Sequence, residues 1–142
     1  MKIRKFEISD YDSVYALWQG TANIGLNDID DSREGIEKYL TRNPHTSFVA
    51  ELDGEIVGTI MCGNDGRRGY IHHACVVSEL RHRGIGTGLV EKALSALSDL
   101  GITKAALVVF ERNKGGNEFW ERIGFTTRPD LVYRNKVILQ KK

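Results

Sequence analysis

"RHRGIGTG" (81–88) places two arginines before three glycines, each two residues from the next. A strand-like run, "YIHHACVV" (70–77), precedes this stretch, and a helical pattern, "LVEKALSALSDL" (89–100), follows it. A glycine-rich turn between a strand and a helix exposes backbone N–H groups at the positive end of the helix dipole. Glycine also lets the backbone come close to a ligand, because it has no Cβ. The stretch therefore predicts a phosphate site, with an ordinary helix start and solvent-facing arginines as the alternative.

Two common nucleotide-binding motifs fit this turn poorly. Gly84, Gly86 and Gly88 do not have the G-x-G-x-x-G spacing of a dinucleotide fold, and no acidic residue ends a strand about 20 positions later. A P-loop is excluded because no Gly-Lys-Ser/Thr follows. A nucleotide-binding α/β module, which would bind NAD, is therefore the weaker hypothesis.

The composition indicates one compact domain. The chain has 142 residues, of which 41% are hydrophobic and 27% charged, as in proteins with a single core. A net charge of +1 gives no field for nucleic acid, and no apolar run approaches the roughly 20 residues that span a bilayer. Cys62 and Cys75 lie in apolar runs and suggest buried thiols in a reducing compartment. We expect one cytoplasmic domain over residues 1–142, with neither a nucleic-acid nor a membrane partner.

Apolar periodicity predicts elements in the order βααβββαβαββ, an α/β (mixed α+β) fold with a mixed, largely antiparallel sheet. Asp-Gly at 53–54 is a hairpin signal between two of the strands. The predicted strands are 2–8, 47–52, 56–62, 70–77, 104–110, 125–128 and 131–139. The predicted helices are 9–20, 31–40, 85–100 and 113–123.

Two of these stretches resemble sequence motifs of the GNAT acetyltransferase superfamily. "VVSELRHRGIGTGLVEKAL" (76–94) resembles its motif A, Arg/Gln-x-x-Gly-x-Gly/Ala, and "NKGGNEFWERIGF" (113–125) resembles its motif B. The order of elements agrees over essentially the whole chain. "GNDGRRGYIHHACVV" (63–77) also resembles the small bacterial YpeA-like branch.

The resemblance implies acetyl-CoA as co-substrate, no metal, an amine acceptor and a possible homodimer. The pyrophosphate would lie on the backbone of the glycine turn, and the pantetheine arm would pair with the preceding strand. Asn113 would lie near the cofactor, with an N-cap as the equal alternative. The implied cofactor residues are Ala74, Cys75, Val76, Arg81, His82, Arg83, Gly84, Ile85, Gly86, Thr87 and Asn113.

Acetyl transfer to an amine needs a base, a polarised thioester carbonyl and a protonated leaving thiolate. His72 matches a histidine used by arylalkylamine acetyltransferases and is the first candidate base, with a structural histidine as the alternative. Strict alternation along the strand puts His72 with Tyr70 and Ala74 on one face, and His73 with Cys75 on the other. His73 is assigned to packing.

Glu111 is a second candidate base, with a solvent-facing charge as the alternative. A backbone N–H near Val76 would polarise the carbonyl. The sequence departs from the family at two positions: Trp120 replaces a tyrosine that often protonates the thiolate, and Val108 replaces the glutamate of the ribosomal-protein acetyltransferases. Tyr133 could also approach the site.

The expected function is acetyl-CoA-dependent N-acetylation of a primary amine in a small molecule or peptide. The alternative is a catalytically weak, GNAT-like acyl-CoA-binding sensor or interaction module. The acceptor would enter past the loop "TANIGLNDIDD" (21–31), whose Asp28, Asp30 and Asp31 would attract cations. Alternatively, Asp30 and Asp31 serve the start of the next helix.

Overall fold

The computed structural model describes residues 1–139, in two compact units that divide the chain at Val108 and Val109. The first unit holds β1 (Lys2–Lys5), α1 (Tyr11–Gln19), α2 (Arg33–Arg42), β2 (Phe48–Leu52), β3 (Glu55–Asn64), β4 (Gly69–Val76), α3 (Ile85–Asp99), β5 (Ala105–Ala106) and the short 3-10 helices η1 (Ile8–Asp10) and η2 (Ser78–Leu80). The second holds α4 (Lys114–Arg122).

The five strands form one sheet in the order β1-β2-β3-β4-β5, antiparallel except for the β4–β5 pair. The predicted mixed, largely antiparallel sheet is therefore confirmed. At the β2–β3 turn, Asp53 and Gly54 both have positive φ, 52° and 80°. This conformation matches the twist of a hairpin and explains the Asp-Gly pair.

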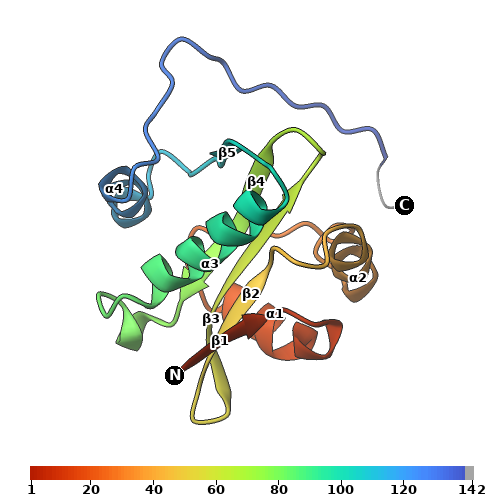
Figure 1. The fold of residues 1–142 in the computed structure, drawn as a ribbon, viewed down its shortest axis with the longest axis vertical. Coiled ribbons are helices and arrows are strands. Elements are labelled where there is room, and N and C mark those ends of the chain that lie inside the picture. Colours follow the sequence, from red (N-terminus) through yellow and green to blue (C-terminus); the bar gives the residue numbers. More distant parts are fainter. Residues whose placement is uncertain (140–142) are drawn as a thin grey trace. The chain divides into compact units, whose positions relative to one another are not determined.

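Helices cover both faces of this sheet (Figure 1). On one face, α1 and α2 enclose a core that includes Trp18, Ile36 and Met61. On the other face, α3 packs so closely that a Cβ on Gly69 would come within 2.6 Å of Leu97 Cδ1. This close packing fixes the axis of α3, and with it the position of the glycine turn at its N-terminus.

The structure contradicts the two strands predicted at the C-terminal end. Residues 125–128 and 131–139 form no strand in the described chain, and Val132 and Ile138 are 75% and 94% exposed. Alternating side chains favour a strand, but a strand also needs a neighbouring strand for its backbone groups, and within the described residues no strand pairs with these segments. Similarly, the strand predicted over 104–110 shortens to Ala105–Ala106, with Val108 exposed. The predicted order holds as far as α4.

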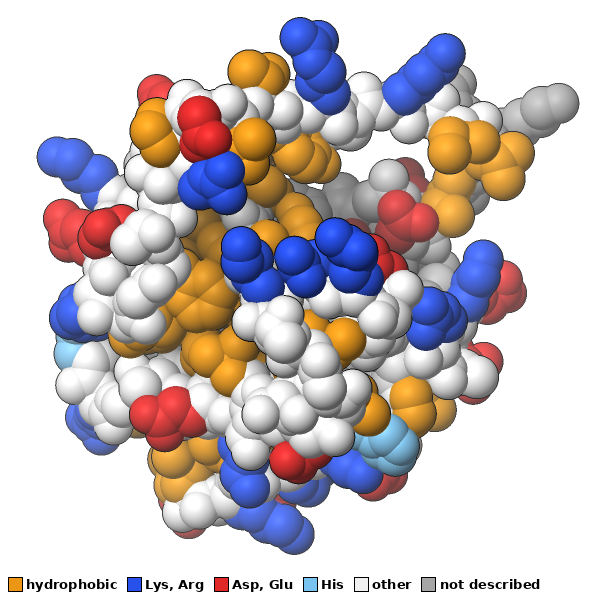
Figure 2. All heavy atoms as spheres, turned by 45° about the horizontal axis from the view of Figure 1, so that its top comes forward, with side chains coloured by type: hydrophobic (Ala, Val, Ile, Leu, Met, Phe, Trp, Pro, Cys, Tyr) orange, Lys and Arg blue, Asp and Glu red, His pale blue; other side chains and the backbone are white. Residues whose placement is uncertain are grey.

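Acidic and basic side chains are interspersed on the face shown in Figure 2, apart from one row of Lys and Arg near its centre. This distribution agrees with a net charge close to zero. Among the described helices, none has the length and apolar content that crossing a membrane requires.

Candidate functional site

The glycine turn has the geometry of an anion site. Gly84, at φ 84°, is the N-cap of α3, and His82 also has a positive φ of 64°. The first helical hydrogen bond runs from Gly88 N–H to the Gly84 carbonyl at 3.0 Å. The N–H groups of Ile85, Gly86 and Thr87 therefore precede the first N–H that donates within the helix, and they point out of the helix start, where the dipole favours negative charge.

Positive side chains flank these N–H groups. Arg81, His82 and Arg83 are all exposed at the turn. Arg81 also donates from Nε to the Val76 carbonyl at 3.2 Å, which ties the turn to the end of β4. The turn can thus offer backbone donors and cationic side chains to the same anion.

Beside this turn, β4 has an open edge. Its pairing with β5 is restricted to Gly69 with Ala105 and Tyr70 with Ala106. On the other side, Val77 N–H donates to the Val57 carbonyl of β3. Backbone groups alternate in direction along an antiparallel strand, so those of Ala74 and Val76 point away from β3 to the open edge. A ligand with amide groups can add to such an edge as a strand does.

A β-bulge in β4 overturns the predicted placement of the two histidines. Ala74 pairs with Ile60 and Ile71 with Cys62, so Met61 alone lies opposite two residues, His72 and His73. The extra residue interrupts the alternation and brings both rings to the α1–α2 face of the sheet. Ala74 is on the opposite face from His72, because it pairs with Ile60 in the row that α3 covers.

His72 lies between two tyrosines, 5.5 Å from the Tyr39 ring and 4.7 Å from the Tyr70 ring. Its side chain still reaches solvent. Desolvation by these neighbours lowers the pKa of His72, and the adjacent His73 lowers it further. A neutral imidazole at pH 7 that solvent can reach is able to accept a proton.

His73 is held by a carboxylate from a distant part of the chain. Its Nε2 lies 2.8 Å from Asp31 Oδ1, and its ring packs on Trp18 with centroids 4.8 Å apart. The other carboxylate oxygen, Asp31 Oδ2, accepts from Asn27 N–H at 2.7 Å. Asp31 is therefore buried and paired, and the prediction that it attracts a cationic acceptor at the surface is wrong.

Asp31 does not cap the second helix either. Ser32 is the N-cap of α2, and its hydroxyl accepts from Gly35 N–H at 3.0 Å. Asp28 and Asp30 remain exposed on the loop. Neither the bulge nor the Asp31–His73 contact leaves a local signal in the sequence, apart from the adjacent His-His pair within one strand.

The remaining predicted residues are in the second unit, Val109–Lys142. Asn113 is the N-cap of α4, and its side chain accepts from Gly116 N–H at 3.0 Å. This is the N-cap role that the sequence predicts as the alternative to a place near the cofactor. Trp120 packs between Phe119 and Phe125, with centroids 5.0 and 5.1 Å away. Glu111 and Tyr133 are exposed. The roles predicted for Glu111 as a base and Asn113 beside the cofactor stay predictions.

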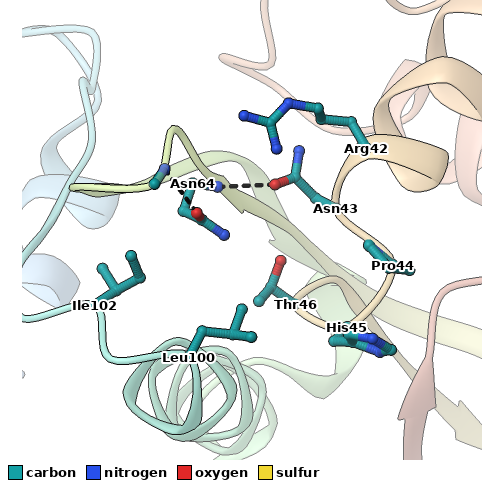
Figure 3. A pocket seen from close by; sticks show the side chains of 9 residues that line it. Arg42, Asn43, Pro44, His45, Thr46, Asn64, Leu100 and Ile102 are labelled. Carbon is teal, nitrogen blue, oxygen red and sulfur yellow. Dashed lines mark hydrogen bonds between the residues drawn. The ribbon is translucent and has the colours of Figure 1, made fainter.

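A cavity of about 260 Å³ lies elsewhere in the first unit, beside the C-terminal end of α3 (Figure 3). Leu100 and Ile102 line it on one side and Asn43 and Asn64 on another, and Asn64 N–H donates to Asn43 Oδ1 at 3.0 Å. None of the predicted site residues lines this cavity. It is separate from the glycine turn, which is at the other end of the same helix.

Comparison with known proteins identifies the class. The model of the Acetyltransferase (GNAT) family matches residues 11–125. An acetyltransferase of Photorhabdus laumondii is 35% identical over 146 residues, covering 100% of this chain and 99% of that protein. The chain belongs to the GNAT acetyltransferase family, as the two motifs predicted.

Solved structures show the same fold. Ard1 of Thermoplasma volcanium has a TM-score of 0.78 at 24% identity, over 88% of this chain and 82% of that one. The PaiA N-acetyltransferase of Thermoplasma acidophilum, in complex with coenzyme A, has a TM-score of 0.77 at 22% identity, over 89% of this chain and 90% of that one.

Proposed function

We propose that this acetyltransferase moves the acetyl group of acetyl-CoA to a primary amine of a small molecule or peptide. The observation that carries the proposal is the open edge of β4 at Ala74 and Val76, directly beside the glycine turn at the start of α3. A strand edge and a helix N-terminus side by side suit the two parts of CoA, an amide-bearing arm and a pyrophosphate. Family membership supports the same assignment.

The predicted cofactor residues would hold both parts of this ligand. The pyrophosphate would accept hydrogen bonds from the backbone of His82 to Thr87 and would be flanked by Arg81 and Arg83. The arm would pair with the β4 backbone from Ala74 to Val76. A CoA-bound PaiA N-acetyltransferase with the same fold is consistent with this placement.

His72 is our proposed base for the acceptor amine. An alkylammonium must lose a proton before its nitrogen can attack the thioester carbonyl, and the lowered pKa keeps His72 neutral for that step. The N–H of Val76 would donate to the carbonyl oxygen as it gains charge. Trp120 offers an indole N–H without a titratable proton, so the departing thiolate would take its proton from solvent.

A cationic acceptor would suit the loop between α1 and α2. Asp28 and Asp30 are exposed there, whereas Asp31 is buried. Two carboxylates beside the entrance would raise the local concentration of a polyamine or a cationic peptide and disfavour an acidic acceptor.

A binding module without useful turnover is the second candidate, because Trp120 and Val108 replace side chains that act in other members of the family. Thiol release from acetyl-CoA against a panel of amines separates the two. The enzyme predicts release that depends on the amine and an acetylated product. CoA binding with no release for any amine would favour the sensor.

We also propose that residues 1–142 form one acetyltransferase domain, since the family match runs from residue 11 to residue 125.

A further inference from the structure

The loop between α1 and α2 lies against β4 at both of its ends. At its C-terminal end, Asp31 Oδ1 lies 2.8 Å from His73 Nε2, a contact between residues 42 positions apart. At its N-terminal end, the side chain of Thr21 lies beside the Cys75 thiol. Burial raises the pKa of the Cys75 thiol to about 11, and the Thr21 hydroxyl donates to the Leu17 carbonyl at 2.7 Å.

His73, at the bulge, and Cys75, two residues later, lie on the same face of β4. Cys75 pairs with Thr59 and packs against the α1–α2 core, and His73 packs on Trp18 of that core. Two positions on one face of β4 therefore lie against the two flanks of residues 22–30, which we call the acceptor loop. A compact surface loop with its ends fixed close together is typical of functional Ω-loops.

The acceptor loop is also ordered internally around Asp31. Asn27 N–H donates to Asp31 Oδ2 at 2.7 Å, and the Asn27 side-chain oxygen accepts from the N–H groups of Ile29 and Asp30 at 2.8 and 2.9 Å. This turn leaves Asp28 and Asp30 on the outside and keeps Asp31 inside. The Asp31–His73 contact therefore anchors a preformed turn and not a single side chain.

We propose that Asp31 and His73 are a positioning pair that holds the acceptor loop beside the β4 bulge, so that a bound acceptor amine meets His72. The pair acts on the acceptor and not on the cofactor, because neither side chain belongs to the glycine turn. This inference rests on the proposed acetylation of an amine. The argument for the pair is geometric. The relative exposure of Asp31 is 4%, because its carboxylate contacts β4 and its own loop. Asp31 therefore cannot itself bind the acceptor.

Replacing His73 tests the pair. His73→Ala removes the partner of Asp31, and we expect the acceptor KM to rise on the order of tenfold, as for loss of a charge-assisted hydrogen bond. The Kd of acetyl-CoA by calorimetry and the slow hydrolysis of acetyl-CoA without amine should stay within about twofold. His73→Gln should restore most of the acceptor affinity, because its amide N–H can donate to Asp31. His45→Ala, which removes an exposed histidine from the segment between α2 and β2, is the matched control and should leave the acceptor KM, the Kd and the hydrolysis rate unchanged.

Hydrogen exchange gives a readout that does not need turnover. Loss of the anchor in Asp31→Asn or His73→Ala should speed exchange at the amides of Asn27, Ile29 and Asp30, while the amides of α3 keep their protection. If His73→Ala fails to fold, His73→Gln and Asp31→Asn carry the test, with exchange as the measurement.

The outcomes separate the two proposals. A wild-type enzyme that acetylates no amine overturns the proposed function, and the role of the pair with it. A wild-type enzyme that turns over while His73→Ala keeps the wild-type acceptor KM and wild-type exchange in residues 27–30 overturns the pair alone. An equal rise in acceptor KM and acetyl-CoA Kd, with no rescue by His73→Gln, would also overturn it, since it would indicate general damage to β4.

Discussion

Gly86 offers the sharpest separation of stability from cofactor binding. It is the second residue of α3, in the turn whose N–H groups would hold the pyrophosphate. Within a helix, alanine in place of glycine lowers the entropy of the unfolded chain and should stabilise the fold by about 0.5 kcal/mol. The same methyl group would stand between the backbone and the phosphate oxygens. Gly86→Ala should therefore fold more stably but bind acetyl-CoA less tightly.

The expected loss of affinity follows from the number of hydrogen bonds at risk. Three N–H groups, at Ile85, Gly86 and Thr87, precede the first N–H that donates within the helix, that of Gly88. A hydrogen bond to a charged group contributes about 1.5–3 kcal/mol, so lengthening one of them should weaken binding roughly tenfold or more. Gly86→Val, with a branched Cβ, should exceed that loss.

Calorimetry with acetyl-CoA measures the affinity, and urea unfolding followed by circular dichroism measures the stability. Gly84→Ala is the matched control for strain: its Cβ would meet nothing within 4 Å, but its φ of 84° should cost about 1–2 kcal/mol of folding free energy. Gly86→Val with wild-type affinity for acetyl-CoA would refute the assignment of the pyrophosphate to this turn.

Three further predictions concern single side chains. Arg83→Ala should weaken acetyl-CoA binding a few-fold, about 1 kcal/mol, because one exposed charge is lost beside the pyrophosphate; calorimetry at two salt concentrations checks it, and no change at low salt would contradict it. If neutral His72 is the base, kcat/KM should rise with pH through a pKa below the ordinary histidine value of about 6.5, and His72→Ala should remove that limb and slow transfer roughly 10²-fold. A pH–rate profile decides this. If kcat/KM of the variant rises with pH as in the wild type, His72 has a structural role and is not the base. Asp28→Asn should raise KM for a cationic acceptor with kcat nearly constant, and the effect should shrink at high salt. Equal KM values for the wild type and Asp28→Asn at low salt would leave this carboxylate without a part in acceptor binding.

The sequence predicts the parts of the fold that local physics determines. The glycine turn, the Asp-Gly hairpin and the apolar stripe of α3 each follow from residues close together in the chain, and each appears where expected. The family motifs also predict the order of helices and strands, which is correct as far as α4.

Contacts between distant segments could not be predicted in the same way. The bulge at His72 and His73 depends on how β4 pairs with β3, and one extra residue reverses the face of the side chains before it. Asp31 lies in an acidic stretch that is typical of an exposed loop. Its burial depends on a contact with His73, 42 residues away. The apolar alternation of residues 131–139 is local, whereas a strand also requires a partner.

The crystal structure of a complex with CoA would test the account's central claim most directly. The account predicts pyrophosphate oxygens about 3 Å from the N–H groups of Ile85 to Thr87, and pantetheine amides paired with the backbone of Ala74 and Val76. CoA bound elsewhere, for example in the cavity beside Asn43 and Leu100 (Figure 3), with the β4 edge left free, would contradict it.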